Sequence, residues 1–255
     1  MGIGTVLGAT FGVVAAWAMP AVGADLEGAA VTVAEAAPWR ADGSRIAPAS
    51  LRYRILVIVD GEEFAFGSEV NRSRESWRGI PVWRVETRAR VPAGELVDTV
   101  YLNAADLVAL HRDVRIGEGR VTLDLGPEGI SGAIVEPGGE DRPVTIPTAG
   151  PVVGHLDTAF AGAALAPGFE AHFRTLDLER QQVHEWRATV TGVESVEVPA
   201  GRFGTYRLEL VDVGGSGLAA TVWMNRQTPR WMVRSELTGR DAGGKVVAEL
   251  ESAQD

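Results

Sequence analysis

The chain has 255 residues, a length that fits one all-β domain or two small domains. Apolar residues make up 45% of it, which is enough for a hydrophobic core and excludes a wholly disordered protein. The absence of cysteine excludes disulfides, Cys-ligated zinc, iron–sulfur clusters, thiol catalysis and a lipidated N-terminal cysteine. The net charge of −10 argues against nucleic acid as a partner.

Residues 1–24 have the features of an export signal. They carry no charged side chain, and their apolar stretch ends at Pro20, followed by small residues at 22–24. This pattern predicts a signal peptide that is cleaved before Asp25, with an uncleaved anchor as the alternative. No later segment reaches about 18 consecutive apolar residues, so we expect no membrane span after cleavage. The mature protein is therefore expected in the periplasm or outside the cell.

The rest of the chain divides into an arm and one β-rich domain. Residues 25–50 are rich in Ala, Gly, Ser and Pro without clear periodicity, which indicates an irregular N-terminal arm or linker. From residue 51 to residue 255, short apolar or alternating runs are separated by turn residues, so we expect a single antiparallel β domain. The expected strands are 51–59, 62–70, 82–91, 97–102, 107–116, 120–125, 129–135, 169–178, 183–193, 204–213, 219–224, 231–237 and 245–251.

The sequence also predicts two kinds of turn and one helix between these strands. Asp60-Gly61 between two apolar runs predicts a tight hairpin. The fragment Val-Pro-Ala-Gly occurs at 91–94 and again at 198–201, through shared turn chemistry or a duplicated hairpin. A helix is expected over 156–165, capped by Asp157 or Thr158. Strands at this spacing with one short helix favour an antiparallel sandwich or barrel over βαβ units.

The polar residues form no recognisable catalytic or metal motif. None of the four histidines lies three to five residues from another, so no local chelate is expected; they are His111, His155, His172 and His184. No serine stands in a G-x-S-x-G pattern. We therefore expect no catalytic residue, no metal and no cofactor. A hydrolase whose site is assembled only in space stays an alternative, and it would need a cleft with convergent titratable groups of perturbed pKa; if all four histidines were exposed and unpartnered, a histidine-based mechanism would fail.

The aromatic residues give the candidate ligand-binding site. Trp83 and Trp186 fall on the apolar register of their strands, and other aromatic residues lie on similar faces. Such faces could line a cavity for a hydrophobic ligand, or they could form an ordinary packed core. The candidate residues are Trp83, Phe169, Phe173, Trp186, Tyr206 and Trp223.

The C-terminal half contains a series of short signatures in a fixed order. They are Gly192-Val193-Glu194, Pro199-Ala200-Gly201-Arg202-Phe203, Trp223, Pro229 and Arg234-Ser235-Glu236. This order resembles a bacterial exported family of unknown function, with G-x-E, P-A-G-x-F and W-x-x-x…P…R-x-E. More distantly, the pattern is similar to the LolA/LolB-like lipoprotein-carrier group. The resemblance covers about residues 51–251.

The resemblance implies an antiparallel sheet that is curled into an incomplete barrel, with a helix over its open side. Together with the strand pattern, this predicts a mainly antiparallel all-β fold, a curled sheet or incomplete β-barrel of about 10–12 strands with one short helix. In the carrier group, the concave face of such a sheet holds acyl chains. The leading expectation is thus an exported, non-enzymatic cell-envelope protein that binds a lipid or another hydrophobic ligand. It requires an apolar interior of several hundred Å³, and a tightly filled interior would contradict it.

The second expectation is a structural or protein-interaction module of the envelope. Such a module would show an exposed apolar patch, or a sheet edge that can accept a partner strand. An envelope protein would then be its partner.

Overall fold

The computed structural model describes residues 39–59, 61–178, 180–215, 217–239 and 244–254, and the expected signal peptide lies outside them. These residues form fourteen strands, one α-helix and one 3-10 helix. Their bounds are η2 Gly43–Arg45, β1 Ala49–Val59, β2 Glu62–Trp77, β3 Ile80–Val91, β4 Gly94–Asn103, β5 Ala109–Ile116, β6 Gly119–Leu125, β7 Gly129–Val135, β8 Asp141–Pro147, α1 Leu156–Ala161, β9 Glu170–Asp177, β10 Gln182–Val198, β11 Gly201–Asp212, β12 Ala219–Asn225, β13 Met232–Thr238 and β14 Lys245–Gln254.

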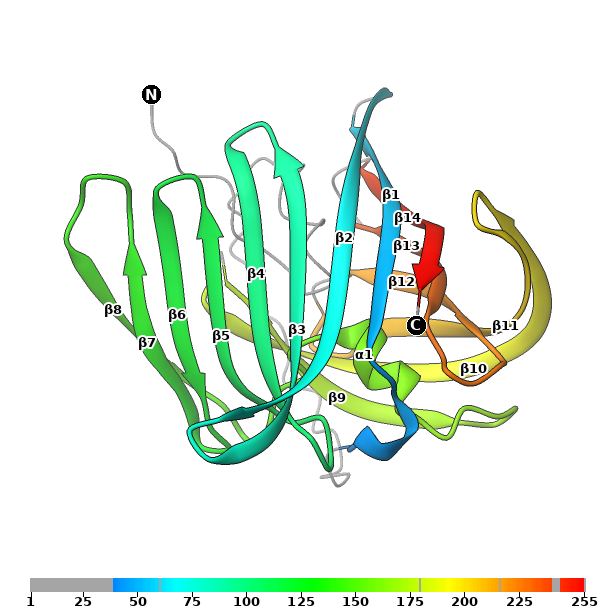
Figure 1. Ribbon diagram of the computed structural model, residues 1–255, viewed down its shortest axis with the longest axis horizontal. Helices are drawn as coiled ribbons and strands as arrows, with labels where there is room; N and C mark the ends of the chain where they lie inside the picture. Colours follow the sequence, from blue (N-terminus) through cyan, green and yellow to red (C-terminus); the bar gives the residue numbers. More distant parts are fainter. Residues whose placement is uncertain (1–38, 60, 179, 216, 240–243, 255) are drawn as a thin grey trace.

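All fourteen strands belong to one antiparallel sheet in the order β8-β7-β6-β5-β4-β3-β2-β1-β14-β13-β12-β11-β10-β9. Strands β2–β8 and β9–β14 are two meanders, and β1 joins them by pairing with both β2 and β14. Figure 1 shows the curl that results, because β3–β8 stand upright while β9–β11 run across them. The sheet stays open, since the described edge strands β8 and β9 do not pair with each other. The expected all-β fold with an incomplete barrel is confirmed.

The sheet has fourteen strands against the expected number of about 10–12; thirteen correspond to the expected runs, and the one that no run predicted is β8. It contains Pro143 and Pro147, and its first residue is the charged Asp141. Prolines and charges predict a loop because they oppose a central strand. As an edge strand, however, β8 needs backbone hydrogen bonds on its β7 side only, so prolines are tolerated there.

Alternating side chains build the core on the concave face of the sheet. In β3, Trp83, Val85 and Ala89 are buried, whereas Arg88 and Arg90 are exposed. This is the period of two that a strand with one solvated face requires. The same alternation continues through β4–β7 and β10–β12 and produces one continuous hydrophobic cluster.

Helix α1 lies inside the curl, in the segment that connects the two edge strands β8 and β9 (Figure 1). All six of its residues are buried, so it is a core element and not an amphipathic surface helix. The helix is shorter than expected, because it ends at Ala161. The cap also differs from the expectation: His155 occupies the N-cap, and Asp157 lies in the first turn.

Residues 39–46, here called the strap, cross the outside of α1 and connect distant strands. The backbone amide of Trp39 donates to the carbonyl of His172 in β9 at 3.0 Å, and that of Asp42 donates to the carbonyl of Gly162 at 3.1 Å. Gly43 then donates to the carbonyl of Ala105, between β4 and β5, at 2.9 Å. The part of the expected irregular arm that the structure describes therefore contains only η2 before β1, and its backbone hydrogen bonds link β9, the end of α1 and the β4–β5 connection.

The expected hairpin turns are present. Val59 pairs with Glu62 across the β1–β2 turn, and Gly61 has a positive φ of 83°. The two Val-Pro-Ala-Gly fragments connect β3 to β4 and β10 to β11, and their glycines, Gly94 and Gly201, have φ of 123° and 124°. The same backbone geometry in both places agrees with shared turn chemistry, because glycine adopts positive φ without strain.

Candidate functional site

The inner cavity lies between the N-terminal end of α1 and the concave face of the sheet. Its apolar wall comes from β1, β2, β12, β13 and β14, through residues such as Ile55, Val70, Leu237 and Val246, and from Leu156 of α1. Its volume is about 40 Å³. That is room for a few ordered water molecules and far below the several hundred Å³ that a lipid-sized ligand fills. The interior is thus closed in this structure, and the inner cavity does not provide the expected apolar space of several hundred Å³.

Polar groups also line the inner cavity. They are Tyr53, Ser68, His155, Asp157 and Ser235. The Tyr53 hydroxyl donates to the carbonyl of Met232 at 3.1 Å. Burial, and then the nearby Asp157 carboxylate, raises the pKa of Tyr53 well above its usual value, so this hydroxyl stays protonated.

The charge of Asp157 is stabilised by His155 and Arg72. Burial alone would raise the pKa of Asp157, but the ion pair and hydrogen bond with His155 and the field of Arg72 outweigh it and lower the pKa. The backbone amide of Thr158 also donates to Asp157 Oδ1, at 2.8 Å. Because Arg72 comes from β2 and the other groups from α1, this buried charge cluster connects the helix to the sheet.

One part of this cluster has the order hydroxyl–imidazole–carboxylate. Thr87 Oγ1 lies 3.4 Å from His155 Nε2, and His155 Nδ1 forms the ion pair with Asp157. A catalytic triad has the same order, but its nucleophile must face a substrate. Thr87 is only 1% exposed and does not line the inner cavity. The arrangement therefore serves packing in this structure, although His155 is buried and partnered as a histidine-based site requires.

An open groove, here called the outer groove, lies beside the inner cavity where β2 separates from β3. Its volume is about 430 Å³, and its walls carry charged residues of β1–β4 and β14. Tyr53 and Ser68 line both the outer groove and the inner cavity. The two spaces are thus neighbours, with these two side chains between them.

The candidate aromatic residues do not gather around one cavity. Trp83, Phe173 and Trp186 are buried in the core, and none of the six lines the inner cavity. The Trp83 indole donates to the carbonyl of Gly43 at 3.1 Å, and the Trp186 indole donates to Thr175 Oγ1 at 2.9 Å. Those two indoles therefore hold the strap and the edge strands in place.

The other three candidates are partly exposed. Phe169 lies edge-on to Trp39, with ring centroids 6.1 Å apart. The Tyr206 ring lies beneath the guanidinium groups of Arg226 and Arg230. Trp223 is on the convex face of β12, where its indole donates to Glu194 Oε1 at 2.6 Å.

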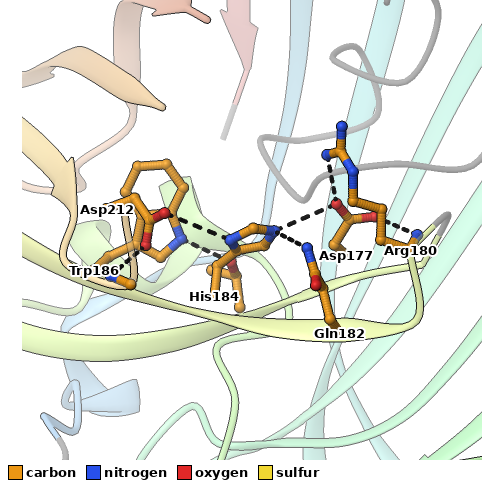
Figure 2. A network of polar contacts seen from close by, with 8 residues as sticks. Asp177, Arg180, Gln182, His184, Trp186 and Asp212 are labelled. Atoms are coloured by element: carbon orange, nitrogen blue, oxygen red, sulfur yellow. Dashed lines mark hydrogen bonds and ion pairs between the residues drawn. The ribbon is translucent and has the colours of Figure 1, made fainter. Parts of the chain in front are cut away.

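A second buried charge cluster, around His184, lies on β9, β10 and β11 (Figure 2). His184 Nε2 donates to Asp177 Oδ2 at 3.3 Å, and Nδ1 lies 3.7 Å from Asp212 Oδ2. The hydrogen bonds to Asp177 and Asp212 raise the pKa of His184 to about 9 against the effect of burial. The imidazole is therefore a cation at neutral pH, between two carboxylates.

The partners of the His184 cluster are all fixed by neighbouring groups. Burial opposes ionisation of Asp177, but hydrogen bonds from His184 and from the Arg180 amide hold the pKa of Asp177 below its usual value. The Gly214 amide donates to Asp212 Oδ1 at 2.9 Å. None of the three ionised residues lines the inner cavity or the outer groove, so we assign the His184 cluster to the stability of the β9–β11 edge.

An aromatic group is found on the convex face. The Trp77 ring stacks on Tyr101 and His111, with centroids 5.6 and 5.0 Å apart. The Arg78 guanidinium lies 4.2 Å from the Trp77 ring centroid, and His111 Nδ1 lies 2.7 Å from Asp124 Oδ1. The rings contact one another, so this group is a surface cluster that joins β2, β4, β5 and β6.

Among the described residues, no group of three or more acidic or histidine side chains is placed to hold a metal ion. In the same part of the chain, no helix is long and apolar enough to cross a bilayer. Sequence reasoning missed the Arg72–His155–Asp157 cluster because Arg72 and Asp157 are 85 positions apart in the sequence. The available signal was the His-x-Asp spacing at the start of the one expected helix.

Comparison with known proteins identifies the family. A family model described as a protein of unknown function (DUF3108) matches residues 53–251. The chain belongs to this family. The expectation of a family of unknown function is confirmed. No curated protein matches the DUF3108 chain.

Solved structures resemble this DUF3108 chain in fold. A β-barrel-like protein of the family DUF1849 from Brucella abortus matches with a TM-score of 0.53 at 9% identity, over 82% of this chain and 98% of that one. A protein with a YmcC-like fold from Bacteroides fragilis matches with a TM-score of 0.35 at 11% identity, over 86% and 98%. A DUF1329 family protein from Desulfovibrio piger gives 0.36 at 10% identity, over 83% and 87%. The first likeness supports the curled β architecture alone.

Proposed function

We propose that this DUF3108 protein is an exported, non-enzymatic binding protein of the cell envelope that takes the apolar chain of a lipid into the concave face of its sheet. The observation that carries the proposal is the inner cavity, with apolar walls from five strands and a roof of only one six-residue helix. The export signal expected in residues 1–24 supports the envelope location.

The closed interior requires that the ligand displaces the roof. The roof segment, residues 156–165 with α1 at its start, buries three large apolar side chains, Leu156, Phe160 and Leu165, besides Asp157, Thr158 and alanines. Exposing three such side chains costs about 5–9 kcal/mol. Burying a sixteen-carbon chain contributes on the order of 10 kcal/mol at ~0.8 kcal/mol per CH₂. The free energy needed to expose the roof and the free energy gained by burying an acyl chain are therefore similar, as reversible binding requires.

The test is native mass spectrometry of the mature protein, purified from the envelope without detergent and followed by lipid extraction. We expect an adduct of lipid mass that denaturation releases. Ala248→Val adds two methyl groups inside the cavity and should reduce the adduct. Ala133→Val makes the same change on the other side of β7 from the buried Ile130 and Ile134, and should leave the adduct unchanged. Clean apo masses for the wild type would contradict the proposal.

A second candidate function is an envelope interaction module, and the β1–β2 hairpin favours it. Residues 62–67 of β2 pair with β1 only, and Phe64 on this segment is 56% exposed. A strand with one free side can accept a partner strand. Affinity capture with the wild type and with Phe64→Lys tests this function, and it requires a stoichiometric envelope protein that the variant loses.

A further inference from the structure

The sheet divides locally at Gly67. The β2–β3 ladder begins at the pair Ser68–Ala89, whereas β2 continues to pair with β1 from residue 67 back to Glu62. On the other side of the gap, Arg90 pairs with Glu95 of β4. The outer groove lies over this gap, and Tyr53 and Ser68, which line it, also line the inner cavity.

Gly67 keeps the outer groove wide. A Cβ atom at this position would meet nothing within 4 Å, and the backbone is not in the left-handed region. Glycine is therefore not required there for the turn or for packing. Its effect is the absence of a side chain in the wall of the outer groove, at the position next to Ser68, which lines both the groove and the cavity.

The charges in the outer groove are balanced but not all paired. Arg52 lies 3.8 Å from Glu69, and Arg88 lies 3.5 Å from Glu95. Two further charged residues of the groove, Arg90 and Glu251, make no ion pair with any other residue that the structure describes. The groove therefore presents one cation and one anion to a ligand.

We propose that the outer groove binds the head group of a single-chain zwitterionic amphiphile, one that carries a phosphate and an ammonium, and admits its acyl chain to the inner cavity past Tyr53 and Ser68. Arg90 pairs with the phosphate, since guanidinium and phosphate oxygens match in geometry. Glu251 pairs with the ammonium. This assignment rests on the proposed function and names its ligand class and its access route.

The experiment compares three sixteen-carbon probes by native mass spectrometry and titration calorimetry below their critical micelle concentrations. They are palmitoyl-lysophosphatidylethanolamine, palmitate and monopalmitoylglycerol. We expect the zwitterion to bind at least about tenfold more tightly than the other two, because each lacks one or both charges. Equal or tighter binding of palmitate or monopalmitoylglycerol would overturn the head-group assignment.

Variants test the access route and the head-group contacts separately. Gly67→Leu should weaken binding of the zwitterion by about tenfold or more. Gly204→Leu, at a strand glycine with equally open space, should leave this binding unchanged. Arg90→Glu and Glu251→Gln should each weaken binding of the zwitterion about tenfold and leave binding of monopalmitoylglycerol unchanged. Arg187→Glu, at an exposed arginine of β10, is the matched control.

The two proposals fail in different ways. If the wild type binds none of the three probes and carries no native adduct, the proposed lipid-binding function is wrong. If the wild type binds but Gly67→Leu binds equally well, lipid binding stands and the access route is overturned. Unfolding midpoints of each variant, measured alongside, identify any loss that comes from misfolding.

Discussion

The indole of Trp83 donates its hydrogen bond to the carbonyl oxygen of Gly43, 40 positions earlier in the chain. This contact attaches the strap to β3 and holds the cover over α1. A Cβ atom at Gly43 would lie 2.1 Å from the carbonyl oxygen of Ala104, so only glycine fits at this crossing. The strap is thus fixed against β3 and the β4–β5 connection by a hydrogen bond and by close packing.

We predict that Trp83→Phe lowers the free energy of unfolding by about 1–3 kcal/mol, because the buried Gly43 carbonyl loses its donor. Gly43→Ala should lower it by about 1–3 kcal/mol through overpacking against Ala104. Urea unfolding monitored by circular dichroism measures both changes. Gly204→Ala, where a Cβ has open space, is the control, and an equal loss there would refute the steric argument.

The His184 cluster predicts a loss of stability at alkaline pH. The pKa of His184 rises from 6.5 in the unfolded chain to about 9 in the folded one. Its contribution to stability is therefore complete below pH 6.5 and is lost as the pH rises through about 9. We expect the free energy of unfolding to fall between pH 7 and 10, and NMR titration of the His184 ring should give the raised value.

Removing the imidazole should abolish this alkaline loss. His184→Gln removes the buried cation that lies between Asp177 and Asp212, which costs about 3–5 kcal/mol at pH 7. The variant should also show a flatter stability profile between pH 7 and 10. His172→Gln, at a partly exposed histidine of β9, should behave as the wild type does. A His184→Gln profile that still falls through pH 9 would contradict the assignment.

Local patterns in the sequence were sufficient to predict the strands that alternate and the turns that require glycine. The run 82–91 predicted β3 to within two residues, and Asp60-Gly61 predicted the β1–β2 hairpin. Period-two alternation and positive φ are local properties, so they are visible without the fold. The edge strand β8 was missed because its tolerance of proline depends on which side is unpaired, a property of the whole sheet.

The candidate site was less predictable, for a physical reason. The register of Trp186 was correct, since it alternates with the apolar Ala188. Its contact with Thr175, and the position of Trp223 on the convex face, depend on neighbouring strands. The split at Gly67 depends on where the β2–β3 ladder begins, and no residue pattern marks that point. Cavities lie between segments, so periodicity within one segment does not locate them.

The cluster at α1 predicts a loss of stability at acid pH. Asp157 has a lowered pKa in the folded protein, so its contribution is present above the unfolded value of 3.8 and is lost as the pH falls through the folded value. Asp157→Asn should lower the free energy of unfolding by about 3 kcal/mol at pH 7, because it removes the buried charge that interacts with Arg72 and His155. Below pH 3.8 the difference from the wild type should shrink. Asp141→Asn, on the exposed end of β8, is the control and should not change the free energy of unfolding. A pH-independent difference between Asp157→Asn and the wild type would contradict the electrostatic reason.

A buried ion pair on β4 and β5 allows a more detailed test of core electrostatics. Arg112 Nε donates to Asp98 Oδ1 at 3.0 Å and Nη2 donates to Oδ2 at 2.6 Å, and both residues are buried. Asp98→Leu leaves the guanidinium buried without its partner and should cost about 3–5 kcal/mol. The double variant Asp98→Leu with Arg112→Met should recover most of that loss, because an apolar pair needs no desolvated charge. A double-mutant cycle, measured by urea unfolding, gives the coupling energy of the pair. If the double variant is as unstable as Asp98→Leu alone, the core requires the shape of this pair and not its charge.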